Sequence, residues 1–120
     1  MVKIKCFTDA ETFFKEADID AVIIAVPHYF HPVYAKECFK RGINVLTEKP
    51  AGVYTRLVRE MNEAAARSGV KFGIMFNQRT NPAFKTMKKM IADGKIGEIK
   101  RTNWIITNWY RTQDYYDSGS

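Results

Sequence analysis

The chain has 120 residues, of which 46% are hydrophobic, so it is long enough and apolar enough to fold around a core of its own. Its formal net charge is +6, but basic and acidic residues are interleaved along the sequence, so charge alone indicates no nucleic-acid partner. The sequence has no run of ~18 apolar residues that could span a membrane and no signal-peptide pattern, so we expect a cytoplasmic protein. Its two cysteines, Cys6 and Cys38, lack metal-ligand spacing, so we expect no metal site.

The first part of the sequence alternates short apolar runs with helical patterns. The predicted strands are 2–7, 21–26, 43–46 and 70–76, and the predicted helices begin at residue 8 and cover 32–41 and 55–68. Thr8 and Glu11 have the spacing of a capping box, and Gly42 and Gly69 follow the later helices as C-terminal caps. The run 21–26 is uninterruptedly apolar, which predicts a strand buried on both faces. Single helices between strands predict parallel pairing and therefore an α/β fold.

The pattern changes after Arg79. Pro82 and Gly94 predict the start and the end of a helix, and alternation from Glu98 to about Tyr110 predicts a long strand of an antiparallel sheet. This change predicts a domain boundary between residues 79 and 80. The helical spacing also predicts the side chains of the earlier helices that face the core: Phe13, Phe14, Ala17, Val33, Cys38, Phe39, Leu57 and Met61.

Polar residues follow three of the predicted strands, at the edge where open parallel sheets bind ligands. They are the runs 27–31, 47–50 and 77–79. Glu48 and Lys49 place an acid beside a base, and Pro50 stiffens the chain directly after the lysine. A lysine ammonium aimed in this way stabilises the alkoxide charge that develops during hydride transfer between an alcohol and a ketone. The alternative interpretation is an exposed ion pair, which contributes little to stability.

The order and spacing of these motifs resemble one known family. The chain resembles the Gfo/Idh/MocA family of oxidoreductases over nearly its whole length. The motifs that carry this resemblance are Pro27, His31, the run Glu48-Lys49-Pro50, the run 76–79 and the turn 93–98. The resemblance implies a Rossmann domain that binds NAD or NADP in residues 1–79, followed by the beginning of an α+β substrate and oligomerisation domain in residues 80–120. It also implies that the substrate is a sugar, cyclitol or related polyol. We further expect a homo-oligomer with no nucleic-acid or membrane partner.

The resemblance assigns roles to individual residues. Lys49 matches the catalytic lysine, which lies near the nicotinamide and the reacting carbon, orients the substrate and assists proton movement. The cofactor-binding residues that the resemblance implies are Pro27, His31, Glu48, Lys49, Pro50 and Arg79. Tyr110 and Arg111 are weaker candidates for contact with the substrate.

Other interpretations of these residues stay open. His28 and His31 also suit a helix cap or the surface, and Arg79 also suits an ion pair at the domain boundary. Aromatic residues near the C-terminus fit sugar stacking, but their alternation along a strand favours sheet packing or a subunit interface. These residues are Trp104, Trp109, Tyr110 and Tyr115.

Two motifs of the resembled family are missing. No glycines form the G-x-G-x-x-G loop that holds a pyrophosphate, and no Asp and His have the D-x-x-x-H spacing of its general acid or base. We therefore expect a truncated Rossmann-like sheet, weak cofactor binding and no activity of this chain by itself. The alternative is a non-catalytic relative that keeps the fold for binding or assembly. Without the first two strands, the segment 2–7 pairs directly with 21–26, pairs elsewhere, or leaves an edge that another copy covers.

Overall fold

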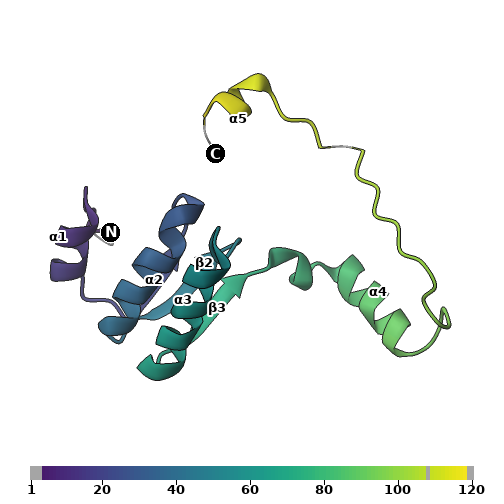
Figure 1. Ribbon diagram of the computed structural model, residues 1–120, viewed down its shortest axis with the longest axis horizontal. Coiled ribbons are helices and arrows are strands. Elements are labelled where there is room, and N and C mark those ends of the chain that lie inside the picture. The colour runs from purple at the N-terminus through teal and green to yellow at the C-terminus, as the bar shows by residue number, and fades with distance from the viewer. Residues whose placement is uncertain (1–3, 108, 119–120) are drawn as a thin grey trace. The chain divides into compact units, whose positions relative to one another are not determined.

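The computed structural model describes residues 4–107 and 109–118 (Figure 1). The chain divides into two units, residues 1–75 and residues 76–120. In the described residues, the first unit contains a three-stranded sheet and three α-helices, and the second contains two α-helices. No helix in the described residues is long and apolar enough to cross a membrane.

A parallel sheet forms the centre of the first unit. Its strands are β1 (Ala21–Ile24), β2 (Asn44–Glu48) and β3 (Phe72–Met75), in the spatial order β1-β2-β3. Val22 lies beside Val45, which lies beside Phe72 on its other side. Parallel neighbours need crossover connections, and helices supply both of them. The predicted α/β class with a parallel sheet is confirmed, although the strands predicted at 21–26 and 70–76 are shorter than expected.

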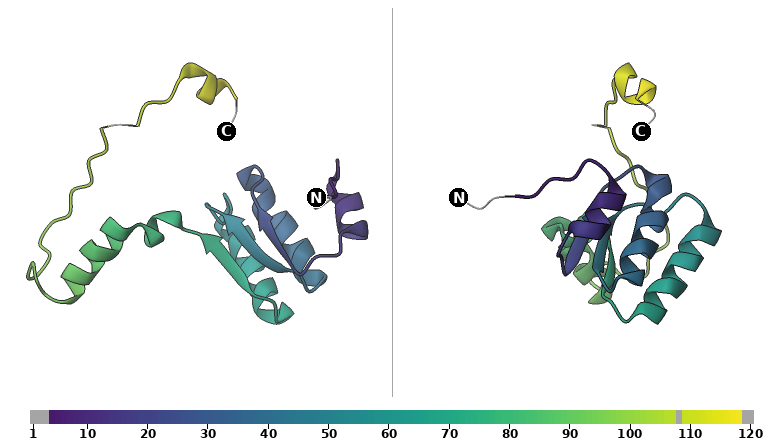
Figure 2. Two further views of the ribbon diagram at one scale, coloured as in Figure 1. Left: turned by 180° about the vertical axis from the view of Figure 1, so that it is seen from behind. Right: turned by 90° about the vertical axis from the view of Figure 1, so that its left-hand side faces the viewer.

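Two helices cover one face of this sheet (Figure 2). They are α2 (His31–Lys40), which follows the short 3-10 helix η1 (His28–Phe30), and α3 (Thr55–Ser68). Gly42 and Gly69 follow these helices with φ angles of 70° and 72°, which glycine adopts without steric cost. Both predicted C-terminal caps are therefore confirmed, and α3 has the bounds that the sequence predicted.

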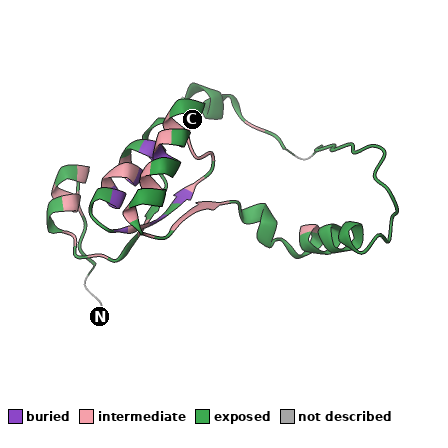
Figure 3. Ribbon diagram, turned by 60° about the horizontal axis from the view of Figure 1, so that its bottom comes forward, coloured by how far each residue is buried: buried purple, intermediate pink, exposed green. Residues whose placement is uncertain are grey.

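The core of the first unit lies between these helices and the sheet (Figure 3). Its buried apolar side chains are Ile24, Ala35, Cys38, Phe39, Ile43, Val45 and Met61. Of the predicted core residues on α2, Cys38 and Phe39 are buried and Val33 is exposed. The buried stripe of α2 runs from His31 through Ala35 to Cys38 and Phe39, and this helical spacing leaves Val33 facing solvent.

The helix α1 (Ala10–Glu16) precedes the sheet and packs Phe14 against the edge of the core. Its N-cap is Asp9, whose side chain accepts a hydrogen bond from the N–H of Thr12 at 2.8 Å. The predicted cap at Thr8 is therefore wrong by one residue, because a carboxylate at Asp9 caps the helix and also favours the positive end of its dipole. The hydrogen bond from the Thr12 backbone lowers the pKa of Asp9.

The strand predicted at 2–7 is wrong where the structure describes it. Residues 4–7 are not in a strand, and residues 2 and 3 lie outside the described residues. A strand needs a hydrogen-bonded neighbour, and this segment instead leads directly into α1. Among the described residues, β1 pairs only with β2, so direct pairing of residues 4–7 with β1 is contradicted. Coverage of the edge by another copy stays a prediction.

The second face of the sheet is open in the described part of the chain. Ile23 on β1 and Leu46 on β2 are 63% and 37% exposed. The prediction that the run 21–26 is buried on both faces is therefore wrong for this chain. Its apolar pattern fits a doubly covered parallel strand, but α2 and α3 lie on the same face.

The second unit begins with the 3-10 helix η2 (Asn77–Thr80) and continues with α4 (Pro82–Ala92). The side chain of Asn81 accepts a hydrogen bond from the N–H of Ala83 at 2.9 Å and so caps α4. Gly94 follows the helix with a φ of 67°. The helix predicted from Pro82 to Gly94 is therefore confirmed.

The strand predicted from Glu98 to Tyr110 is wrong. Residues 98–107 and 109–110 lie outside any strand, and the chain continues into a short helix, α5 (Gln113–Asp117), that the sequence pattern did not predict. Alternation of apolar and polar residues gives a strand only where a neighbouring strand pairs with it. The described residues of the second unit contain no such neighbour.

Candidate functional site at the carboxyl ends of β1 and β2

A pocket of about 240 Å³ opens where β1 and β2 end. It is lined by Ala25, Val26, His28, His31, Glu48 and Lys49. Because the two strands are parallel, their carboxyl ends meet at one edge of the sheet, and the loops that follow them bring these side chains together. The first unit has larger hollows at the edge of β1 and on the open sheet face, but apolar surface dominates both of them.

His31 is the most completely enclosed polar residue of the site, with no exposed side-chain surface. Its Nδ1 lies 2.7 Å from the carbonyl oxygen of Pro50, and its Nε2 lies 2.8 Å from the carbonyl oxygen of Val26. The ring therefore connects the end of β1 to the loop that follows β2. The interpretation of His31 as a surface residue is wrong, because helix α2 begins at this residue and turns the ring inward.

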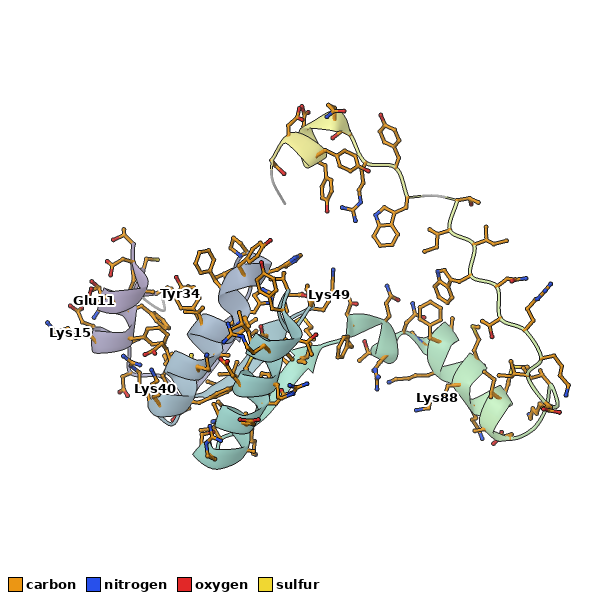
Figure 4. The ribbon with its side chains drawn as sticks, viewed as in Figure 1. Glu11, Lys15, Tyr34, Lys40, Lys49 and Lys88 are labelled. Carbon is orange, nitrogen blue, oxygen red and sulfur yellow. The ribbon has the colours of Figure 1, made fainter. Side chains whose placement is uncertain are left out.

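Lys49 lies just beyond the end of β2 (Figure 4). It is exposed, and its side-chain nitrogen makes no hydrogen bond or ion pair with the described residues. Glu48 does not pair with this ammonium, because one carboxylate oxygen of Glu48 accepts a hydrogen bond from the backbone N–H of Lys49 at 3.0 Å. The alternative of a Glu48–Lys49 ion pair is therefore not what the structure shows.

Pro50 follows Lys49 through a cis peptide bond. The carbonyl group of Pro50 is held by His31, and the loop then passes Gly52, which packs against Pro32 at the start of α2. The backbone on both sides of Lys49 is thus fixed, by Glu48 before it and by Pro50 after it. The lysine side chain itself stays free to meet a ligand.

Pro27 ends the first loop of the site. It lies directly before η1, and its carbonyl oxygen accepts a hydrogen bond from the N–H of Phe30 at 2.9 Å. In η1, the ring of His28 lies edge-on to that of His31, with 5.6 Å between their centroids. His28 is exposed, in agreement with its interpretation as a surface residue.

Arg79 lies in η2, in the second unit. Its guanidinium group lies 5.5 Å from the centroid of the Phe76 ring and makes no ion pair with the described residues. The role of Arg79 in cofactor binding stays a prediction.

The aromatic residues Trp104, Trp109, Tyr110 and Tyr115 are exposed. They do not pack on a sheet as the sequence pattern predicted, because the described residues of the segment 98–110 form no strand. The guanidinium group of Arg111 instead lies 5.2 Å from the ring centroid of Trp109 and 3.9 Å from that of Tyr115. Tyr110 is exposed. No described residues form a cluster that could hold a metal ion.

Two parts of the site were not predicted from the sequence. They are the carbonyl group of Val26 and the lack of a side chain at Gly52. A backbone carbonyl leaves no signal in a sequence. Gly52 did have one, since a glycine two residues after Pro50 indicates a close approach of the backbone, which in this case is to Pro32.

Comparison with known proteins gives the family. A family model described as an oxidoreductase family with an NAD-binding Rossmann fold matches residues 1–76, which is more than half of the chain. The chain belongs to this oxidoreductase family. Its resemblance to Gfo/Idh/MocA oxidoreductases and its Rossmann-like fold are thereby confirmed.

Relatives of the chain include the inositol 2-dehydrogenase of Rhizobium meliloti, which is 33% identical over 84 residues, covering 70% of this chain and 26% of the relative. A solved scyllo-inositol dehydrogenase from Lactobacillus casei, with bound NAD(H) and scyllo-inositol, is 30% identical and has a TM-score of 0.73, covering 77% of this chain and 27% of that one. The WlbA dehydrogenase from Bordetella pertussis, in complex with NADH and UDP-GlcNAcA, has a TM-score of 0.81 at 27% identity, covering 93% and 32%.

The chain spans only a part of these proteins. It covers between 22% and 28% of the length of the first curated relatives that it matches. Membership of the family and the Rossmann-like fold therefore hold for this chain, whereas the activity, the substrate and the partners of the whole protein belong to the proposal that follows.

Proposed function

We propose that this chain is the cofactor-side portion of an oxidoreductase that transfers a hydride between NAD or NADP and a sugar, cyclitol or related polyol. The observation that carries the proposal is the position of Lys49. Its backbone is fixed at the carboxyl end of β2, and its ammonium group is exposed and unpaired among the described residues. In this scheme residues 1–79 form the cofactor-binding domain and residues 80–120 begin the substrate domain.

The side chains of the pocket fit the reacting end of such a cofactor. Lys49 offers a hydrogen-bond donor for the oxygen of an alcohol or ketone, and Glu48 is withdrawn from it by its own bond to the backbone. The sequence offers no glycine-rich loop for the pyrophosphate, so we expect weak binding by this chain alone. The nicotinamide, when bound, accepts or donates the hydride.

The contribution of Lys49 follows from the charge that appears during the reaction. When a hydride leaves the carbon of an alcohol, its hydroxyl proton must also leave, and in the reverse direction a ketone oxygen gains negative charge. An amine held at that oxygen takes up the proton in one direction, and an ammonium donates to the oxygen in the other. Pro27, His31, Pro50 and Arg79 are proposed to shape the cofactor site around it.

A non-catalytic relative that keeps the fold for binding or assembly is the second candidate. The absence of both G-x-G-x-x-G and D-x-x-x-H from the sequence favours it. In either case we further propose a cytoplasmic location. We also propose a homo-oligomer, because β1 has no described neighbour on its outer edge, which another copy could cover.

Saturation-transfer NMR of the 120-residue chain with NAD⁺ and with NADP⁺ tests the proposal. We expect saturation of the nicotinamide protons, and we expect Lys49→Met to reduce it. Lys88→Met is the matched control, because Lys88 is an exposed lysine of α4 without a described partner. Equal loss in both variants, or no transfer to nicotinamide in the unmodified chain, would contradict the role of Lys49 and favour the non-catalytic candidate.

A further inference from the structure

The environment of His31 constrains the hydrogens on its ring. Both ring nitrogens face backbone carbonyl oxygens, Pro50 at 2.7 Å and Val26 at 2.8 Å. A carbonyl oxygen only accepts hydrogen bonds, so each contact is a hydrogen bond only if the nitrogen carries a hydrogen. A ring with one hydrogen would place a nitrogen lone pair against the other oxygen. Two hydrogen bonds at these contacts therefore need hydrogens on both nitrogens.

The burial of the ring gives these contacts weight. His31 has no exposed side-chain surface, so water cannot replace either carbonyl group as a partner. The ionisable side chains that line the same pocket are His28 from η1, and Glu48 and Lys49 from the end of β2. Of these, Glu48 is the acid.

We propose that His31 is a positioning residue that donates from both ring nitrogens and thereby ties the loop of Lys49 to the end of β1. Pro50, which directly follows Lys49, is held from one side of the ring, and Val26, which lies in the loop after β1, is held from the other. Lys49 is thus placed at the pocket without a hydrogen bond to His31. The placement of Lys49 for chemistry rests on the proposed function, whereas the double donation does not.

The first experiment observes the ring directly. Proton–nitrogen correlation spectra of the histidine side chains in the 120-residue chain are expected to show two protonated ring nitrogens with slowly exchanging hydrogens for one histidine. His28→Ala should leave this pair of signals in place, and His31→Ala should remove it. A single protonated nitrogen at His31 would overturn the proposal. This measurement needs no cofactor.

The second experiment separates hydrogen bonding from simple filling of space. In His31→Ala, added imidazole and added thiazole are five-membered rings of about the size of the vacated ring. Protonated imidazole donates from two nitrogens, whereas thiazole carries no N–H. We expect imidazole, and not thiazole, to return the carbonyl-carbon shift of Pro50, read through the N–H of Ala51, to its original value. Rescue by both compounds would assign His31 a packing role only and overturn the proposal.

The same samples distinguish failure of the proposed double hydrogen-bond donation by His31 from failure of the proposed function. If His31 positions Lys49 for a cofactor, saturation transfer to nicotinamide should fall in His31→Ala and recover with imidazole alone. If nicotinamide receives no saturation even in the unmodified chain while both ring nitrogens carry hydrogens, the proposed function is wrong and the double donation by His31 is supported.

Discussion

Gly52 lies so close to Pro32 that a β-carbon added to the glycine would come within 2.8 Å of the proline Cγ, and within 3.0 Å of Cγ2 of Val58. At Gly52, the loop after Lys49 therefore packs against Pro32 at the start of α2 and against Val58 of α3. Side-chain atoms do not approach one another to this distance without movement of the backbone or the ring. The close approach therefore depends on the absence of a side chain at residue 52.

Gly52→Ala is expected to destabilise the first unit by about 1–3 kcal/mol, which is typical of inserting a methyl group into a packed contact. Urea unfolding followed by circular dichroism measures the change. Gly73→Ala is the control, because a β-carbon there would lie 3.4 Å from Leu46 Cδ1, an ordinary contact. Equal effects of the two substitutions would argue against the close packing.

Asn44 connects the amino-terminal ends of the strands. Its side-chain nitrogen donates to the carbonyl oxygen of Asp20 at 2.8 Å, and its side-chain oxygen accepts from the N–H of Lys71 at 2.8 Å. Asn44→Ala removes both bonds and should cost about 1–2 kcal/mol of unfolding free energy. Asn62→Ala, at an exposed position of α3 without a described side-chain hydrogen bond, should cost nothing measurable. A loss as large for Asn62 would refute the bridging role.

Met61 fills the space between α3 and the rest of the core, with no exposed surface. Met61→Ala is expected to lower the unfolding free energy by about 2–5 kcal/mol, through lost apolar contact and the cavity left behind. Met87→Ala, on α4, removes a side chain that is 51% exposed and should change stability little. Chemical denaturation of both variants checks the difference, and a cost below that of Met87→Ala would contradict the assigned core.

The sequence predicted those elements whose signals are local. The bounds of α3 follow from its apolar spacing and from Gly69, whose left-handed conformation ends the helix. The strand expected from Glu98 to Tyr110 failed because alternation describes the side chains of a strand and not its neighbour. A strand exists only when another strand pairs with it, and a local pattern does not contain that information.

The site was predictable to a similar extent. The position of Lys49 at a strand end follows from the order of apolar runs and from Pro50. The two partners of His31 lie five and nineteen residues away and are backbone carbonyl groups, so they emerge only when β1 and β2 are placed side by side. For the same reason, adjacency of Glu48 and Lys49 in the sequence suggested an ion pair that the folded loop replaces with a bond to the backbone.

The two cysteines are expected to differ in reactivity. Burial raises the pKa of the Cys38 thiol to about 11, whereas Cys6 is exposed. The thiolate is the reactive form, so at neutral pH an aromatic disulfide reagent should label Cys6 rapidly and Cys38 only after unfolding. Cys6→Ser should then give no rapid labelling. Fast reaction of Cys38 in that variant would contradict its burial.

The same shift predicts how stability depends on pH. Because the pKa of Cys38 is raised from about 9 in the unfolded chain to about 11 in the folded one, the folded state binds more protons between these values. The stabilisation is complete below pH ~9 and is lost as the pH rises toward ~11. Cys38→Ala should remove this loss, and Cys6→Ser should keep it, in urea unfolding measured across the alkaline range. An identical alkaline profile in the unmodified chain and in Cys38→Ala would show that the thiol does not control it.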